Sequence, residues 1–120
     1  MRERNPKDIA ANNRVRLDLV PGPAMVTTAQ ALADGARKYG PYNWRVTPIE
    51  ASGYIAAALR HIKSWQDREE LASDSLVHHL GHAMATLAIL QDALACGTLI
   101  DDRPPVGPTA RLLAEASVAK

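Results

Sequence analysis

The sequence is poor in several residue types, and each shortage narrows the class of protein. Phenylalanine is absent and aromatic residues make up only 4% of the 120 residues, while alanine is abundant. This composition favours closely packed helices over a sandwich of sheets, so we expect an all-α fold. The single cysteine, Cys96, excludes an internal disulfide bond. Because no apolar run is long enough for a signal peptide or a membrane span, we expect no membrane partner and a reducing, cytoplasmic setting.

Neither sign of charge dominates the chain. It has 14 Lys and Arg residues against 13 Asp and Glu, which leaves a net charge of +1. A protein that binds a nucleic-acid polymer needs a concentrated basic surface, so we do not expect such a partner. The length corresponds to one domain whose core would be better covered by oligomerisation. We therefore expect a homo-oligomer, either a dimer or a tetramer.

Proline, glycine and polar residues divide this single domain into successive parts. Residues 1–16 form an N-terminal arm, and residues 17–97 form a core of three main helices. Residues 98–108 form a Pro-rich linker, and residues 109–118 form a short C-terminal helix. A helix of that length is too short to be stable alone, so it should pack on its own body or on a neighbouring subunit.

The first main helix is predicted from about Pro23 to Tyr39, because a proline starts it and Gly40-Pro41 stops it. Apolar residues at helical spacing predict its core-facing stripe, which is Met25, Ala29, Leu32, Ala36 and Tyr39. On the opposite face Asp34 precedes Lys38 by four residues, and we interpret these two side chains as a solvated ion pair.

The second main helix is predicted from about Pro48 to Asp67. Thr47 precedes a proline at the first helical position and Glu50 at the third, which is the pattern of a capping box. We therefore interpret Glu50 as a cap rather than a ligand. The predicted core stripe is Ile55, Leu59 and Ile62, and His61 borders this stripe rather than facing water.

All four histidines lie between Arg60 and Asp92. The third main helix is predicted to begin near Ser73 or Asp74, either of which could cap it, and to end near Gly97. Successive helical residues are about 100° apart, which gathers Ser75, His79, His82 and Thr86 in one stripe. The other faces are apolar or small, so the helix should be buried. A buried imidazole needs a hydrogen bond or a metal, because an unsatisfied buried polar group costs about 1–3 kcal/mol.

Three acids, Glu69, Glu70 and Asp74, occupy the turn before this helix. Residues at i and i+3 of a helix point the same way, so these carboxylates and the imidazoles of His79 and His82 could converge on one divalent metal. A site rich in oxygen ligands favours Mg or Mn, whereas more histidines favour Zn, Mn or Co. The alternatives are a plain acidic loop and histidines that are satisfied by hydrogen bonds.

The loop from Gly40 to Arg45 places Tyr42, Asn43 and Trp44 next to an arginine. Aromatic rings and an amide can hold a planar base by stacking and by paired hydrogen bonds. The alternative is that the two aromatic residues only cover the end of the helical bundle.

The ordered motifs of the chain resemble those of a known family. The matching segments are Arg16-Leu17-Asp18-Leu19-Val20-Pro21, Gly35-Ala36-Arg37-Lys38-Tyr39-Gly40 with Asn43-Trp44, Leu59-Arg60-His61 with Trp65 and Glu69, and His78-His79-Leu80-Gly81-His82-Ala83. In this order they resemble the phage dATP/dGTP diphosphohydrolases, a branch of the MazG-like all-α nucleotide pyrophosphohydrolases. Any one of these motifs would be a weak signal, whereas the ordered set is fairly specific.

The resemblance implies a MazG-like fold and hydrolysis of a purine deoxynucleoside triphosphate, dGTP or dATP, to the monophosphate and pyrophosphate with a divalent metal. Matched residue by residue, it implicates Lys38, Asn43, Trp44, Arg60, His61, Glu69, His79 and His82. The chain differs from the family pattern in the first main helix, where Thr27, Thr28 and Gln30 stand in place of acids.

Such chemistry needs a metal that withdraws charge from the triphosphate, cations that neutralise the phosphates, and a base that takes a proton from water. We expect the nucleotide to be held by Arg37, Lys38, Asn43, Trp44 and Arg60. The expected general base is His61 or Glu70, and the expected ligands of a Mg or Mn ion are Glu69, Asp74, His79 and His82. A non-catalytic nucleotide-binding module and a structural helical oligomer of the same fold are the two alternative functions.

Overall fold

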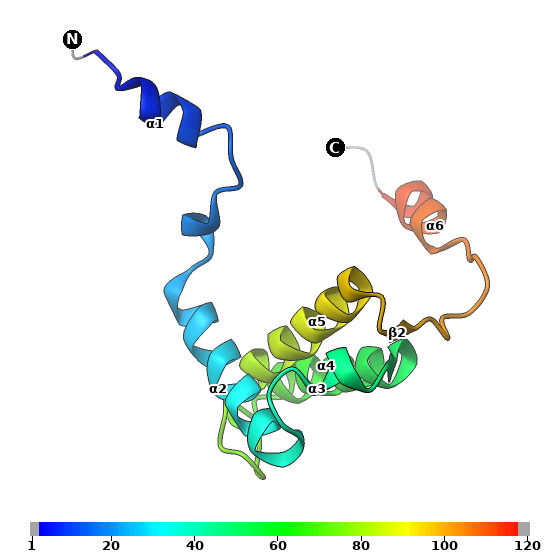
Figure 1. Cartoon of the computed structure of the whole chain (residues 1–120). Coiled ribbons are helices and arrows are strands. Elements are labelled where there is room, and N and C mark those ends of the chain that lie inside the picture. The colour runs from blue at the N-terminus through cyan, green and yellow to red at the C-terminus, as the bar shows by residue number, and fades with distance from the viewer. Residues whose placement is uncertain (1–2, 118–120) are drawn as a thin grey trace.

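A computed structural model, which describes residues 3–117, confirms the all-α class (Figure 1). The elements in chain order are α1 (Pro6–Ala11), the short 3-10 helix η1 (Leu17–Leu19), α2 (Gly22–Tyr39), α3 (Asn43–Val46), β1 (Ile49–Glu50), α4 (Ala51–Gln66), α5 (His79–Cys96), β2 (Leu99–Ile100) and α6 (Thr109–Ala116). The two strands form one short parallel pair, with Ile49 opposite Leu99. The last predicted residue of the C-terminal helix, 118, lies outside the described residues, as do residues 1–2 of the arm.

The body of the molecule is built on α5, which packs against both α4 and α2. Figure 1 shows α4 and α5 side by side, with α2 crossing near one end, while α1 and α6 project away from the body. The radius of gyration of the Cα atoms is 18.6 Å, whereas a compact chain of this length would have about 14 Å. No helix in the described part of the chain is long and apolar enough to cross a membrane.

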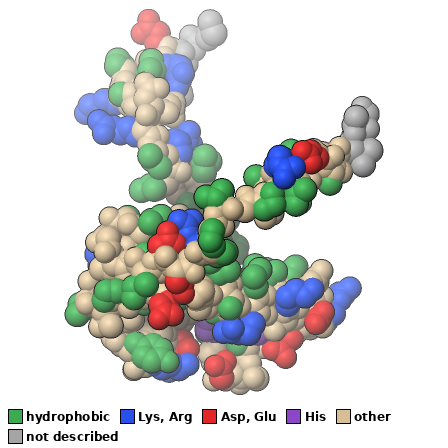
Figure 2. All heavy atoms as spheres, turned by 90° about the vertical axis from the view of Figure 1, so that its right-hand side faces the viewer, with side chains coloured by type: hydrophobic (Ala, Val, Ile, Leu, Met, Phe, Trp, Pro, Cys, Tyr) green, Lys and Arg blue, Asp and Glu red, His purple; other side chains and the backbone are tan. Residues whose placement is uncertain are grey.

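Small residues make the contacts between the three main helices. The buried apolar residues of the helices are mainly alanines, namely Ala31, Ala51, Ala58, Ala83, Ala85 and Ala93. The predicted core stripes are therefore wrong at several positions: Met25, Tyr39 and Leu59 are 59%, 74% and 55% exposed. Helices that meet through alanine and glycine approach closely, and the larger apolar side chains are left on the outside. Figure 2 shows such hydrophobic side chains scattered over the surface of the body.

The closest contact between α2 and α5 is at Gly81. A Cβ atom added to Gly81 would lie 2.5 Å from the backbone oxygen of Thr27 and 2.7 Å from its Cβ atom. Only a residue without a side chain fits there, so Gly81 fixes how α2 crosses α5.

Replacing Gly81 by alanine is therefore expected to lower the free energy of unfolding by about 1–3 kcal/mol, the usual cost of overpacking. Urea denaturation measures this change. Gly53→Ala in α4 is the matched control, because a Cβ there meets nothing within 4 Å among the described residues. Alanine is the better helix former by up to about 1 kcal/mol, so this control should be neutral or slightly stabilising. Equal stability of the two variants would contradict the close crossing.

The predicted capping box at the start of the second main helix is wrong. Ile49 and Glu50 are in extended conformation because they pair with β2, so α4 begins only at Ala51, and the Glu50 side chain makes no cap hydrogen bond. The carboxylate of Asp102 takes its place: it accepts hydrogen bonds from the backbone N–H of Ser52, at 2.8 Å, and from the Ser52 hydroxyl. The cap thus comes from the segment after β2 rather than from the sequence before the helix.

The third main helix also begins later than predicted. Ser73 and Asp74 lie in a loop, and α5 begins at His79, with the His78 ring accepting a hydrogen bond from the backbone N–H of Leu80 at 3.0 Å. Leu76 has a positive φ of 61°, which no continuous right-handed helix allows. The predicted end at Gly97 is confirmed, since Gly97 follows the last helical residue in the left-handed conformation. The acids that precede α5 are consequently loop residues.

Candidate functional site

A cavity of about 640 Å³ lies between α2, α4, α5 and the loop that follows α2. This volume falls in the range of about 300–1,000 Å³ that small-molecule sites occupy. Its polar and aromatic lining residues come from all of these elements and from the loop before α5, and they are Asp34, Lys38, Tyr39, Tyr42, Asn43, Trp44, Tyr54, His61, Asp74, His82 and Thr86. The cavity therefore combines cations, carboxylates, imidazoles and aromatic rings.

Asp34 and Lys38 form one wall of this cavity. The prediction that Asp34 is solvated is wrong, because only 7% of the residue is exposed. Its Oδ2 is 3.0 Å from Lys38 Nζ, and its Oδ1 is 2.6 Å from Nη2 of Arg37. The hydrogen bond from Lys38 lowers the pKa of Asp34, and the same bond raises the pKa of Lys38. Both side chains are therefore charged at neutral pH, and Lys38 presents a cation to the cavity.

A chain of hydrogen bonds runs from Glu69 through His79 to His61. Glu69 Oε1 is 2.6 Å from His79 Nε2, and His79 Nδ1 is 2.8 Å from His61 Nδ1. An ionised carboxylate can only accept, so a neutral His79 carries its proton on Nε2 and accepts through Nδ1. His61 must then carry its proton on Nδ1. This arrangement leaves the lone pair of His61 Nε2 available to take a proton.

His82 completes the group of imidazoles. Its ring stacks on that of His61, with centroids 4.7 Å apart and planes inclined by 12°, and its Nε2 is 2.6 Å from the hydroxyl oxygen of Ser75. Burial lowers the pKa of both His61 and His82 below the ordinary value of 6.5. Both rings are therefore mainly neutral at pH 7.

The acids of the predicted metal site do not all face the cavity. Asp74 and His82 line it, whereas Glu69 and His79 hydrogen bond to each other beside it. Glu70, the alternative base, points elsewhere: its Oε2 is 3.1 Å from Trp65 Nε1 and 3.0 Å from His78 Nε2.

The four predicted metal ligands do not gather into one cluster in the described structure. Within residues 3–117, no group of three or more His, Cys, Asp or Glu side chains is placed to hold a metal ion. The imidazole nitrogens that would bind it are engaged with Glu69, His61 and Ser75. Metal binding by these residues stays a prediction from the sequence.

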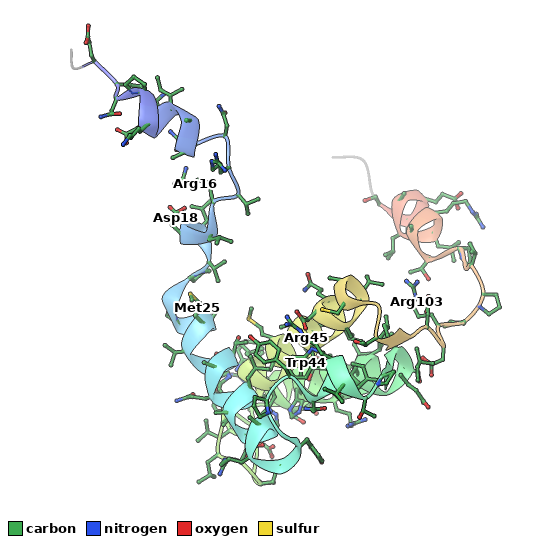
Figure 3. All side chains as sticks on the ribbon, in the orientation of Figure 1. Arg16, Asp18, Met25, Trp44, Arg45 and Arg103 are labelled. Carbon is green, nitrogen blue, oxygen red and sulfur yellow. The ribbon has the colours of Figure 1, made fainter. Side chains whose placement is uncertain are left out.

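The aromatic loop is held against α5 by Asp92. The Trp44 indole N–H donates to Asp92 Oδ2 at 2.7 Å, and the Arg45 guanidinium donates twice to the same carboxylate, each time at 2.8 Å. Figure 3 shows Trp44 and Arg45 next to each other near α5. Trp44 is 8% exposed, so it covers the end of the bundle and also lines the cavity.

The structure brings together part of the predicted nucleotide-binding set. Lys38, Asn43 and Trp44 line the cavity, whereas Arg37 and Arg60 are exposed residues outside its lining. The sequence prediction missed three residues in or next to the cavity as members of the site, namely Asp34, Tyr54 and Asp92, whereas Tyr42 was expected in the loop that could hold a base. The pairing of Asp34 with Lys38 was visible as helical spacing, but no local pattern indicated that this face of α2 turns inward.

Comparison with known protein families gives a match over most of the chain. The family model described as "dATP/dGTP diphosphohydrolase, N-terminal" matches residues 4–103, which include every residue of the cavity. No curated protein and no solved structure matches the chain.

Proposed function

This chain belongs to the dATP/dGTP diphosphohydrolase family, matching its N-terminal model, and on that premise we propose that it hydrolyses a purine deoxynucleoside triphosphate to the monophosphate and pyrophosphate. The family name describes a hydrolase. The preferred substrates in this proposal are dGTP and dATP.

The observation that carries the proposal is the convergence of three kinds of group on one cavity. His61 offers an unprotonated Nε2 that can take a proton from water. Lys38 offers a cation for the phosphate oxygens, and the loop with Tyr42 and Trp44 offers aromatic surface for the base. A triphosphate that lies between the imidazoles and Lys38 would place its purine toward this loop.

Dependence on Mg or Mn is part of the proposal and rests on the sequence resemblance. A divalent metal, when bound, would withdraw charge from the phosphates and lower the pKa of an attacking water. Turnover measured with and without EDTA, followed by addition of Mg or Mn, tests this dependence. Full turnover in EDTA would contradict the proposed dependence on a divalent metal.

A nucleotide screen tests the proposed reaction. The protein is incubated with the common ribo- and deoxynucleoside triphosphates, and pyrophosphate and orthophosphate are measured separately. We expect pyrophosphate from dGTP or dATP, with the monophosphate as the second product. Orthophosphate as the first product would contradict cleavage between the α- and β-phosphates. Binding without turnover would favour a non-catalytic nucleotide-binding module, and no binding would favour a structural helical oligomer.

We also propose that the chain acts as a homo-oligomer, a dimer or a tetramer. This proposal is supported by the large apolar side chains on the outer sides of the main helices, for example Leu87 in α5, at 43% exposure, and Leu94, at 65%. Leu112 and Leu113 of α6 are likewise exposed. Apolar surface of this extent is usually covered by a partner. Light scattering at micromolar concentration should give at least twice the monomer mass of 13.0 kDa, and a monomer would contradict the proposal.

A further inference from the structure

Asp92 makes an unusual number of contacts for a helical carboxylate whose side chain is 28% exposed. It accepts hydrogen bonds from Trp44 and twice from Arg45, and the Cys96 thiol lies 3.9 Å away. Each of the first three bonds pairs an ionised acceptor with a strong donor, and such bonds are short and directional. They join α5 to the short helix α3, whose Arg45 and Trp44 lie 47 and 48 residues earlier in the chain.

Arg45, which Asp92 holds, also contacts the ring of Tyr42. Its guanidinium carbon lies 4.4 Å from the centre of the Tyr42 ring, in the geometry of a cation–π contact. Tyr42 has a positive φ of 54°, an uncommon conformation for an aromatic residue, and its ring centroid is 5.4 Å from that of Trp44. The loop conformation therefore needs contacts that hold it in place, and those with Arg45 and Asp92 supply them.

The two aromatic residues are unequal in their access to the cavity. Trp44 is 8% exposed, whereas Tyr42 is 56% exposed and also lines the cavity. Arg45 does not belong to the cavity lining. Arg45 thus contacts the Tyr42 ring without itself lining the cavity, and of the two aromatic residues, which both line it, Tyr42 is the more exposed.

We propose that Asp92 is a positioning residue of the nucleotide cavity: through Trp44 and Arg45 it holds Tyr42 in place, so that a preformed aromatic wall receives the purine base. The inference rests on the proposed function, because it takes a purine nucleotide as the ligand of this wall. A preformed wall binds more tightly than one that must be ordered on binding. Loss of Asp92 should thus weaken binding of the base without changing the chemistry at the phosphates.

The test compares the wild-type protein with Asp92→Asn, which keeps the shape of the side chain but removes its charge. KM for dGTP, and Kd for its non-hydrolysable α,β-imido analogue, should each rise roughly tenfold, since the restraint acts on binding. The value of kcat should stay within about twofold, because the base makes the same contacts in the ground state and the transition state. Asp92→Glu restores the carboxylate and should recover part of the affinity.

Asp101→Asn is the matched control. Asp101 holds Arg103 through two bonds of 2.7 Å, the same kind of bidentate pair, on the segment after β2 (Figure 3). It does not line the cavity, so its loss should leave KM, Kd and kcat at wild-type values. A rise in KM for both variants would show that any lost ion pair has this effect and would overturn the proposal.

Tryptophan fluorescence reports on the order of the aromatic wall in the absence of nucleotide. The chain has two tryptophans, so a Trp65→Phe background leaves Trp44 as the only indole. In this background Asp92→Asn should increase quenching of Trp44 fluorescence by acrylamide, and Asp101→Asn should not. Unchanged quenching would overturn the restraint, and increased quenching with unchanged Kd would overturn its role in binding.

The failure of the proposed function can be told apart from the failure of this inference. If the wild-type protein binds the analogue but does not hydrolyse dGTP, the proposed reaction is contradicted. A tenfold difference in Kd between wild type and Asp92→Asn would still support the role of Asp92. Equal Kd values for wild type and Asp92→Asn would overturn the role of Asp92 alone. Absence of purine nucleotide binding by the wild type would overturn both.

Discussion

Replacing His61 by alanine is expected to lower kcat by about 10²- to 10⁴-fold, the usual contribution of a positioned general base. The reason is that His61 lines the cavity with its Nε2 unprotonated, because the bonds from Glu69 to His79 and from His79 to His61 fix its proton on Nδ1. KM should change little, since the loss affects proton transfer rather than binding. Steady-state kinetics with dGTP provide both values.

The role of His61 as the base also predicts how kcat/KM depends on pH. Burial lowers the pKa of His61 below 6.5, so kcat/KM of the wild type should fall only in acid, as the imidazole gains a proton. His61→Ala should lose this acidic limb and keep a low, flat rate. A variant that retains the wild-type kcat would contradict the assignment of His61 as the base.

Glu69→Gln separates the two roles that have been given to Glu69. If Glu69 acts through His79, its loss should lower kcat by less than the loss of His61, and metal affinity should be unchanged. If Glu69 is a metal ligand, as the sequence predicts, metal affinity should fall together with kcat. A metal titration of this variant, run beside the kinetics, decides between them, and melting of the same sample excludes unfolding as the cause.

Replacing Trp44 by alanine is expected to have the largest effect on stability. The sequence alone predicts a raised KM with kcat less altered, because the indole is a stacking platform. The structure adds that the residue is only 8% exposed and that its indole N–H binds Asp92. Truncating a buried tryptophan costs about 3–5 kcal/mol, so the variant should show a much lower free energy of unfolding as well as weaker binding.

Trp65→Ala is the control for this prediction, because Trp65 is 41% exposed and does not line the cavity. Its loss should cost less stability. Trp44→Phe keeps an aromatic ring without the N–H and should therefore be folded well enough for kinetic measurements. Similar stability losses for Trp44→Ala and Trp65→Ala would contradict the buried role of Trp44.

The helices could be predicted largely because helical starts and stops are local signals. Gly40 ends α2 and Gly97 ends α5 as expected, since glycine after a helix is recognised from neighbouring residues alone. The imidazole cluster was also foreseeable, because the spacing of His79 and His82 places them on one side of a helix.

The errors come from contacts between distant residues. The cap of α4 is Asp102, which lies 50 residues after the Ser52 that it binds, and no local pattern reports such a contact. Alanine and glycine carry little hydrophobic signal, so the inward face of α2 could not be recognised beside Met25 and Tyr39. For the same reason Asp34 was predicted to be solvated, although it is buried and lines the cavity.

The most direct measurement of the central claim, that the cavity binds a purine nucleotide between the imidazoles and the aromatic loop, is NMR of the imidazole C2–H signals of the four histidines. On titration with the α,β-imido analogue of dGTP, the signals of His61 and His82 should shift and saturate, because both line the cavity. The signal of His78, which hydrogen bonds to Glu70 outside it, should stay in place. Binding that shifts His78 alone, or that leaves His61 and His82 unmoved at saturation, would contradict the account.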